Sequence, residues 1–318
     1  MTHVLLVGAG YMAKEYAKVL KALDVSFDVV GRGKENAEAF QKELGVCVQH
    51  GGIEERFDQS FIPSHAIVAT TLENLEENTI FLLNQGVTNI LVEKPGAVTQ
   101  EGIIRIAALA REKGANVYIA YNRRFYASVI EAQKRIAEDG GLTSFLFEFT
   151  EWSHQLKDLN KTKFQLNNWF IGNSTHVIDT AFFFGGKPKE ISSYVQSYLA
   201  WHPKGSIYAG SGITENNILF SYHANWLAPG SWKLELLTNK NRYIFRPFEK
   251  LHVQKIGTVV IKEIPLDNNL DIQFKPGLYK QIKAFFNVND PLNNYLLNIN
   301  DSVGLFSFYE KMNGLISN

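Results

Sequence analysis

A glycine-rich turn directly after the first apolar run restricts what the start of this chain can fold into. Gly8-Ala9-Gly10-Tyr11-Met12-Ala13 follows the run Val4–Val7 and opens a segment with helical spacing. This order fits G-x-G-x-x-G/A, in which the glycines permit a tight turn and a close approach to a pyrophosphate, and the small last residue permits close packing of helix on strand. The N–H groups at the positive end of the helix would hold the pyrophosphate. Dinucleotide contacts are therefore predicted for Gly8, Gly10, Tyr11, Met12 and Ala13, against the alternative of a tight turn without a ligand.

The first 120 residues alternate short apolar runs with segments of helical spacing, such as Met12–Leu23. Continuous apolar strands are typical of a parallel sheet covered on both faces by helices. We therefore predict a Rossmann-type, doubly wound α/β domain over residues 1–121. Its expected strands are Val4–Val7, Phe27–Val30, Val46–Val48, Ala66–Ala69, Asn89–Val92 and Val117–Ala120.

The pattern changes after Tyr121, where a helix over Tyr126–Glu138 precedes a β-rich, aromatic region. An α+β domain with a predominantly antiparallel open sheet is expected over residues 122–318. Two helices are expected to close the chain, over Gly277–Phe286 and Asp301–Leu315. Packing of these helices back on the first domain stays open. The expected strands are Leu142–Thr150, Ile191–Leu199, Ile218–Tyr222, Trp232–Leu237, Tyr243–Phe245 and Val259–Ile264.

Charge and composition exclude several kinds of partner. The chain has 318 residues with 32 Lys+Arg against 32 Asp+Glu, so no net charge draws it to nucleic acid or to a membrane surface. No stretch approaches the roughly 18 uninterrupted apolar residues of a membrane helix. The single cysteine, Cys47, cannot form an internal disulfide and is predicted to be a small buried hydrophobe. These features favour a cytoplasmic protein without a nucleic-acid or membrane partner.

The end of the second predicted strand bears on the kind of cofactor. NAD-binding domains usually place an acidic residue there, about 20 residues beyond the glycines. Asp28 has this spacing but lies inside the apolar run, and the strand ends in Gly31-Arg32-Gly33-Lys34. Since a guanidinium can hold a 2′-phosphate through bidentate bonds, Arg32 favours NADP(H) over NAD(H). Solvated cations on a loop remain the alternative.

Three further segments carry a family resemblance. Glu93-Lys94-Pro95 follows the fifth strand, Tyr121-Asn122-Arg123-Arg124-Phe125 follows the sixth, and a His-x-x-Asp lies at His176 to Asp179. With the glycine-rich turn, this pattern resembles the glucose-fructose oxidoreductase / inositol dehydrogenase / MocA (Gfo/Idh/MocA) family along essentially the whole chain. The resemblance implies a nicotinamide-binding domain, an α+β domain whose sheet forms homo-oligomer contacts, and activity on sugars, polyols or sugar derivatives.

Hydride transfer at a carbinol carbon leaves a proton to move at oxygen, so a cation and a general acid/base are needed. Lys94 lies at the carboxyl end of a parallel strand, where open α/β sheets bind ligands. It is predicted to polarise the oxygen, although a surface lysine in a turn is the alternative. The resemblance suggests that Pro95 fixes the turn, with a cis bond as one option, and that Glu93 orients Lys94 or binds the nicotinamide ribose.

The second half of the predicted site is the segment Gly172–Asp179. Asn173 or Ser174 is expected to cap a helix, with His176 in its first turn and Asp179 on the same face to orient the ring. The resemblance implies proton exchange by His176, where a structural histidine is the alternative. Family dehydrogenases commonly carry an aspartate four residues before the histidine, and this chain has Gly172 there. This departure puts the mechanism in doubt more than the fold.

Other candidates complete the predicted site. Thr70 and Thr71 match a family position that lies against the cofactor, and Asn122, Arg123 and Asn173 are candidates for the substrate side. Arg124 is weighed equally as a structural ion-pair partner. Ring stacking by Trp152, His154, Trp169 or Trp201 ranks below a core or interface role. The histidines show no metal-ligand spacing, so no metal is expected.

The function expected from these residues is that of an NAD(P)-dependent oxidoreductase acting on a CH–OH group of a sugar, polyol or nucleotide-activated sugar. Two alternatives stay open: a regulator that binds a dinucleotide or sugar without turnover, which Gly172 would permit, and a nicotinamide-dependent glycosidase.

Overall fold

The computed structural model describes residues 3–156 and 161–315, and the chain divides into two compact units. Unit 1 contains residues 3–122 and 270–303, and unit 2 contains the described residues of 123–269 and 304–315. The first division, after Asn122, lies next to the expected domain boundary at residue 121. Residues 270–303, which lie inside the expected second domain of residues 122–318, group with the first unit instead.

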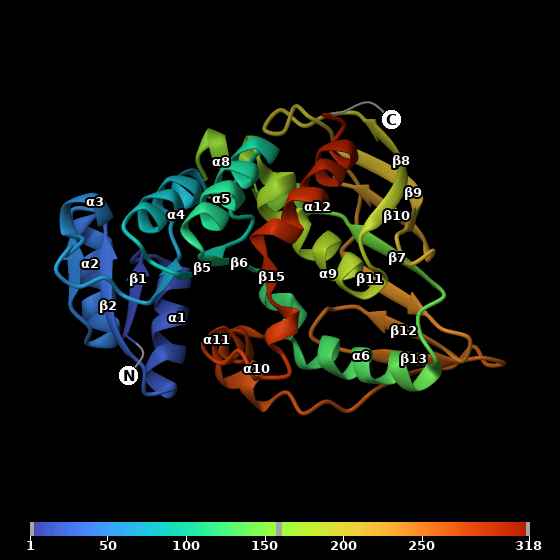
Figure 1. Cartoon of the computed structure of the whole chain (residues 1–318). Helices are drawn as coiled ribbons and strands as arrows, with labels where there is room; N and C mark the ends of the chain where they lie inside the picture. Colours follow the sequence, from blue (N-terminus) through green and yellow to red (C-terminus); the bar gives the residue numbers. More distant parts are fainter. Residues whose placement is uncertain (1–2, 157–160, 316–318) are drawn as a thin grey trace. The chain divides into compact units, whose positions relative to one another are not determined.

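The sheet of unit 1 has the order β3-β2-β1-β4-β5-β6-β15, and its first six strands are parallel while β15 is antiparallel to β6. The order reverses between β1 and β4, so their carboxyl ends frame the crevice in which doubly wound sheets bind ligands. This architecture confirms the Rossmann-type prediction (Figure 1). The strands are β1 His3–Val7, β2 Ser26–Gly31, β3 Val48–His50, β4 His65–Val68, β5 Asn89–Glu93, β6 Asn116–Ala120 and β15 Leu297–Asn298.

Helices cover the unit 1 sheet in two groups, since α1 packs beside α2 and α11 whereas α4 packs beside α5. Helix α1 buries Tyr16, Val19 and Leu20 and turns Lys14 and Lys18 toward Glu43, so its expected amphipathic pattern is confirmed. The helices and 3₁₀ turns are α1 Tyr11–Ala22, α2 Lys34–Leu44, α3 Ile53–Arg56, η1 Leu72–Asn74, α4 Leu75–Asn84, α5 Gln100–Lys113, η2 Asn122–Phe125, α10 Asn269–Gln273, α11 Leu278–Phe286 and η4 Asn293–Tyr295.

The prediction for Cys47 is wrong, because its side chain is exposed. Helix α2 ends on Gly45 in the left-handed conformation, and β3 begins only at Val48 rather than covering the whole apolar run. Strand β3 lies at the edge of the sheet and pairs with β2 alone. Cys47 therefore lies in the connection between the helix and this edge strand, where its side chain is exposed.

The sheet of unit 2 has the order β14-β13-β12-β11-β7-β10-β9-β8, and every pair is antiparallel except β7 with β10. It confirms the predicted α+β domain with a predominantly antiparallel open sheet. Strands β9 and β13 were not among the predicted ones. The strands are β7 Ser144–Phe149, β8 Pro188–Gln196, β9 Ile207–Thr214, β10 Leu219–Asn225, β11 Trp232–Leu237, β12 Asn241–Phe245, β13 His252–Lys255 and β14 Ile261–Glu263.

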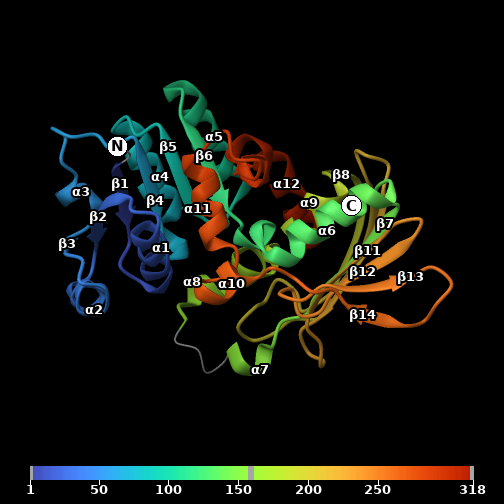
Figure 2. The same cartoon turned by 90° about the horizontal axis from the view of Figure 1, so that it is seen from below.

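Helices α6 and α9 lie on one face of this sheet (Figure 2). Along β7, alternate residues Phe145, Phe147 and Phe149 are buried, and the ring of Phe182 from α9 meets the first two edge to face at 5.9 and 5.8 Å. The helical segments are α6 Ala127–Asp139, α7 Ser153–Leu156, α8 Lys163–Asn167, the π-helical turn η3 Phe170–Ser174, α9 Thr175–Gly185 and α12 Ile299–Met312. Among the described residues, no helix is long and apolar enough to cross a membrane.

Candidate functional site

The glycine-rich turn connects β1 to α1 and touches the ends of two neighbouring strands. Gly8 donates its N–H to the Val30 carbonyl at 2.8 Å and has φ of +126°. A Cβ at this position would lie 2.3 Å from the Ala69 carbonyl oxygen. Both the backbone angle and this close approach exclude a side chain, so glycine is required here.

Gly10 has a different role, because a Cβ there would have no atom within 4 Å. Gly10 is the N-cap of α1, and no side chain caps the helix. The space beside Gly10 is therefore open at the uncapped start of α1, while Ala13 is fully buried. An open cradle in front of uncapped N–H groups suits a pyrophosphate, and the residues present fit a dinucleotide.

Arg32 follows β2 at its carboxyl end and donates from Nη2 to Asn74 Oδ1 at 3.0 Å. Asp28 lies in the exposed first half of the same strand, and its Oδ2 is 2.8 Å from His3 Nε2. Asp28, the acidic residue with the expected sequence spacing, is thus paired with His3 and does not lie at the end of β2. The Arg32 guanidinium lies there instead. Lys34 is exposed and lies 3.8 Å from Glu38, one turn along α2.

The two threonines after β4 are held by asparagine side chains. Thr71 Oγ1 accepts a hydrogen bond from Asn74 at 2.7 Å, and Thr70 Oγ1 accepts one from Asn78 at 3.3 Å. Asn74 therefore links Thr71 to Arg32. This chain of hydrogen bonds orders the connection from β4 to α4 beside the glycine-rich turn.

Glu93, Lys94 and Pro95 form the turn after β5, and the Lys94–Pro95 peptide bond is cis, which confirms the option suggested by the resemblance. Glu93 is buried, and Tyr16 of α1 donates its hydroxyl to Glu93 Oε1 at 2.7 Å. Burial raises the pKa of Glu93, while the charge of Lys94 and the hydrogen bond from Tyr16 oppose the rise. Tyr16 thus fixes the carboxyl group that precedes the half-buried Lys94.

The segment that returns to unit 1 brings two groups that the sequence prediction missed. The Pro276 carbonyl accepts a hydrogen bond from Asn122 Nδ2 at 2.9 Å. The Nζ of Lys275 lies 5.2 Å from the centre of the exposed Tyr11 ring, and its charge also acts on Glu93. No local motif marks Lys275, because its proximity to the glycine-rich turn results from the fold.

In unit 2, Asp179 is bound by Arg124 at 2.8 Å from Nε and 2.6 Å from Nη2. Both side chains are buried. Burial raises the pKa of Asp179, and the guanidinium opposes the rise. The alternative of Arg124 as a structural ion-pair partner is thereby confirmed. Asp179 was expected to orient His176, and the structure shows both of its oxygens bound to Arg124.

The start of α9 differs from the prediction. The expected cap residues do not cap the helix: Ser174 donates to Glu151 Oε1 at 2.7 Å and Asn173 donates to Glu151 Oε2 at 2.9 Å. The π-helical turn Phe170–Ser174 runs directly into α9, so the helical segment begins before His176. The argument that placed His176 at the positive end of a helix is therefore wrong.

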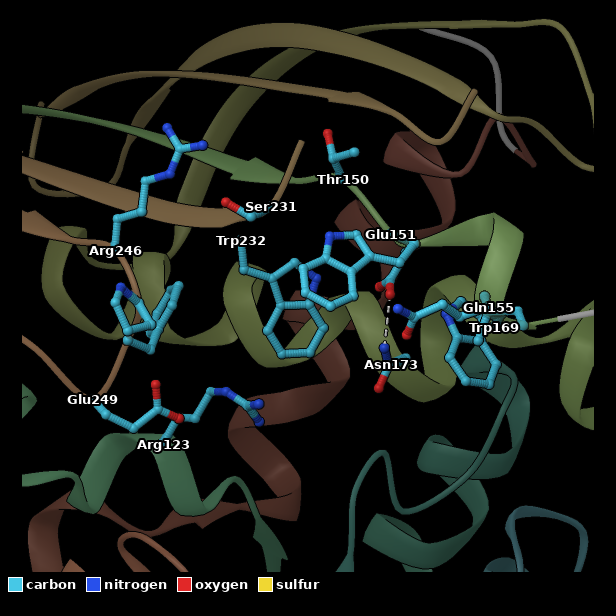
Figure 3. A pocket seen from close by; sticks show the side chains of 14 residues that line it. Arg123, Thr150, Glu151, Gln155, Trp169, Asn173, Ser231, Trp232, Arg246 and Glu249 are labelled. Carbon is cyan, nitrogen blue, oxygen red and sulfur yellow. Dashed lines mark hydrogen bonds between the residues drawn. The ribbon is translucent and has the colours of Figure 1, made fainter. Parts of the chain in front are cut away.

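Glu151 is the main residue that sequence reasoning missed. It follows β7, is 6% exposed, and lines a cavity of about 540 Å³ within unit 2 (Figure 3). Burial raises its pKa, and hydrogen bonds from the side chains of Ser174, Trp169, Asn173 and Trp232 lower it in part. The only sequence signal is a charged residue beside Trp152 at the end of an aromatic strand. The cavity is also lined by Arg123, Trp152, Trp169, Asn173, Trp232, Arg246 and Glu249.

Trp232 of β11 connects several of these groups. The Arg123 guanidinium lies over its ring, 4.6 Å from the centroid, and the ring of the buried His176 lies 6.1 Å away.

Trp201, by contrast, stacks on Trp226 at 5.9 Å, as expected of a core aromatic. The described residues contain no group of three or more His, Cys, Asp or Glu that could hold a metal ion. The cavity therefore offers aromatic faces, a buried acceptor and cations.

Comparison with known families and structures agrees with this geometry. Residues 2–121 match the model of the GFO_IDH_MocA oxidoreductase family with an NAD-binding Rossmann fold. Over these residues the chain is similar to that family. The glycine-rich turn, Thr70, Thr71 and the Glu93-Lys94-Pro95 turn all lie inside the matched range. The curated proteins include no match to this chain.

Solved structures extend the similarity in fold to nearly the whole chain. An oxidoreductase from Agrobacterium radiobacter, in complex with NAD⁺, L-tartaric acid and magnesium, is 12% identical with a TM-score of 0.78, over 97% of this chain and 94% of that one. UDP-N-acetylglucosamine 3-dehydrogenase from Acidithiobacillus ferrooxidans is 13% identical with a TM-score of 0.76, over 99% and 98%. A levoglucosan dehydrogenase in complex with NADH is 18% identical with a TM-score of 0.78, over 98% and 95%.

Proposed function

We propose that this protein, which is similar to an NAD-binding oxidoreductase family over residues 2–121, is a dehydrogenase or reductase that acts on a CH–OH group of a sugar, polyol or nucleotide-activated sugar. The observation that carries the proposal is the turn at the end of β1. Gly8 lies so close to the Ala69 carbonyl that no side chain fits there, and Gly10 leaves open space before the uncapped start of α1. These features suit a dinucleotide at the point where the strand order reverses.

The sugar-type substrate is supported by the cavity of unit 2. Three tryptophans, 152, 169 and 232, line it together with Glu151 and Asn173. Aromatic faces with a few polar groups are what a polyhydroxylated ring requires, since its C–H faces pack on the rings and its hydroxyls need partners. Two structural neighbours are named for sugar-type substrates, levoglucosan and a UDP-sugar.

In the proposed reaction, bound nicotinamide supplies or accepts the hydride. Lys94 polarises the oxygen of the reacting carbon and stabilises its alkoxide character. His176 exchanges the proton at that oxygen. Glu93, held by Tyr16, positions Lys94, and Pro95 fixes the turn. Arg123 and Asn173, which line the cavity, bind substrate, and Asn122 acts on the substrate side of the nicotinamide. Asp179 supports His176 by fixing α9 through Arg124.

For the cofactor we propose a preference for NADP(H) over NAD(H). Arg32 stands at the carboxyl end of β2, and the nearby Asp28 is paired with His3. A guanidinium there complements a 2′-phosphate, whereas the hydrogen bonds of ribose hydroxyls favour a carboxylate. Tyr11, Met12, Thr70 and Thr71 complete the proposed cofactor contacts.

We further propose a cytoplasmic homo-oligomer that associates through the unit 2 sheet. Tyr194 of β8 and Leu219 of β10 are 67% and 61% exposed. The strand registers put both on the face opposite the buried Phe220. Light scattering of the purified protein would test this, and a monomer that persists at high concentration would contradict it.

The function is tested by titrating NADPH and NADH into the protein and following nicotinamide fluorescence. Oxidation and reduction are then assayed over a panel that includes levoglucosan, myo-inositol and UDP-N-acetylglucosamine. We expect binding of NADPH and turnover of at least one panel member. Tight cofactor binding without turnover would favour the regulator, and failure of both cofactors to bind would refute the proposal.

A further inference from the structure

We propose that Glu151 is a specificity-determining residue that accepts hydrogen bonds from hydroxyl groups of a neutral sugar ring in the unit 2 cavity. This inference rests on the proposed function and deepens it, because it names the group on the substrate that the cavity selects.

The two carboxylate oxygens of Glu151 are aimed by neighbours. Ser174 donates to Oε1 at 2.7 Å and Asn173 donates to Oε2 at 2.9 Å (Figure 3 shows the second bond). A carboxylate offers about four acceptor positions. Hydrogen bonding by the side chains of Trp169 and Trp232, which also line the cavity, acts on the same carboxyl group. A ligand hydroxyl in the cavity would therefore join a group of donors that already surrounds Glu151.

One donor in the cavity lining lacks a partner. Arg123 Nε is a buried atom without a hydrogen-bond partner in the structure. A hydroxyl group donates and accepts at once, so a ring with several hydroxyls can serve Glu151 and this donor together. A ligand carboxylate could only accept, and it would place a second negative charge beside a buried one.

Burial makes this acceptor selective. Glu151 is 6% exposed, so water is largely excluded from it, and a substrate that brings an apolar group against the carboxyl instead of a hydroxyl costs free energy. A site built around such a group rejects an analogue that lacks the hydroxyl far more strongly than an apolar wall rejects a missing methylene.

The bound hydroxyl would also lie near the group proposed to exchange the proton. Glu151 binds Asn173 and Ser174, the second of which is two residues before His176. The rings of His176 and Trp232 are 6.1 Å apart, and Trp232 lines the same cavity as Glu151. Trp232 therefore links the cavity that contains Glu151 to the ring of His176, which does not itself line that cavity.

The test uses intrinsic tryptophan fluorescence, because three tryptophans line the cavity. Levoglucosan, myo-inositol, UDP-N-acetylglucosamine and L-tartrate are titrated into the full chain and into Glu151→Gln, with Glu148→Gln as the matched control. Glu148 lies on β7, the strand that precedes Glu151, but it alternates away from the buried Phe147 and Phe149, and it does not line the cavity.

We expect at least one of the three sugar-type probes to bind more tightly than L-tartrate. Glu151→Gln should raise the Kd of that probe by about 10- to 100-fold, the range for one hydrogen bond to a charged group. Glu148→Gln should change it by less than about threefold. A Glu151→Gln variant that binds within about threefold of the unaltered protein would overturn the proposal, as would binding of none of the three sugars.

A second arm does not depend on the folding of the variant. The monodeoxy analogues of the bound sugar are titrated into the unaltered protein, and at least one should lose about tenfold or more in affinity. Equal affinity of all analogues would overturn the proposal. Nicotinamide fluorescence separates this result from the proposed function: sugar binding that depends on Glu151 in a protein that binds neither cofactor would refute only the proposed function.

Discussion

Arg124 binds both carboxylate oxygens of Asp179, at 2.8 and 2.6 Å, and the pair is buried in unit 2. The contact joins the turn η2 to helix α9, which carries His176 three residues before the aspartate. Loss of either side chain would leave the other charge buried and unpaired, so the pair fixes the helix relative to the turn. Asp179 therefore acts on the site through the position of α9.

We predict that Asp179→Ala lowers the free energy of unfolding by about 3–5 kcal/mol, because it leaves the Arg124 guanidinium buried and unpaired. Urea unfolding followed by circular dichroism measures the loss. The double variant Arg124→Met/Asp179→Leu is the control, and it should lose less than the sum of the two single variants. Unfolding of Asp179→Ala at the same urea concentration as the unaltered protein would show that the pair contributes no stability.

Features encoded within a few residues were predicted well. The glycine-rich turn, the six parallel strands and the amphipathic helix α1 depend on local spacing, and all are present. Strand β9 was missed because Gly210 and Gly212 interrupt its apolar pattern. Both glycines are needed there, since a Cβ at Gly210 would collide with the ring of Tyr222 and a Cβ at Gly212 with the ring of Phe220.

The parts of the site that depend on distant residues could not be predicted. Ser174 has the side chain of a helix cap, but Glu151, 23 residues earlier, takes its hydroxyl instead. Lys275 reaches Tyr11 only because residues 270–303 return to unit 1. The exposure of Cys47 likewise follows from the position of β3 at the sheet edge, which its own apolar neighbours do not reveal.

Replacement of Lys94 tests the proposed catalytic cation. Lys94→Ala should lower turnover by at least about 100-fold, the lower range for one electrostatic or acid–base group. Steady-state rates with whichever sugar of the panel is turned over measure the effect, and nicotinamide fluorescence verifies that the cofactor still binds. Lys113→Ala, on the exposed end of α5, is the control. Activity that survives in Lys94→Ala would remove Lys94 from the mechanism.

Replacement of Arg32 tests the cofactor preference. Arg32→Ala removes the guanidinium at the end of β2 and should weaken NADPH by roughly tenfold or more, with a much smaller effect on NADH. Both Kd values come from nicotinamide fluorescence. Lys34→Ala, which removes the neighbouring cation paired with Glu38, controls for a general loss of positive charge. Equal losses for the two cofactors would exclude a 2′-phosphate role for Arg32.

The buried carboxyl of Glu151 should leave a signature in the pH dependence of stability. Burial raises its pKa above the ordinary value of 4.5, so between these two values the unfolded chain loses this proton while the folded protein keeps it. The contribution of Glu151 to stability therefore falls as the pH rises through this window and levels off above the folded-state pKa.

Glutamine does not titrate, so the unfolding free energy of the unaltered protein minus that of Glu151→Gln should decrease as the pH rises above about 4.5. Urea unfolding of both proteins at closely spaced pH values measures this difference, with Glu148→Gln as the control for loss of a carboxylate from the preceding strand β7. Parallel profiles for the unaltered protein and Glu151→Gln would mean that the folded protein ionises Glu151 as readily as the unfolded chain. In that case the cavity would present a hydrated carboxylate, and the argument that burial makes Glu151 selective for sugar hydroxyls would lose its physical basis.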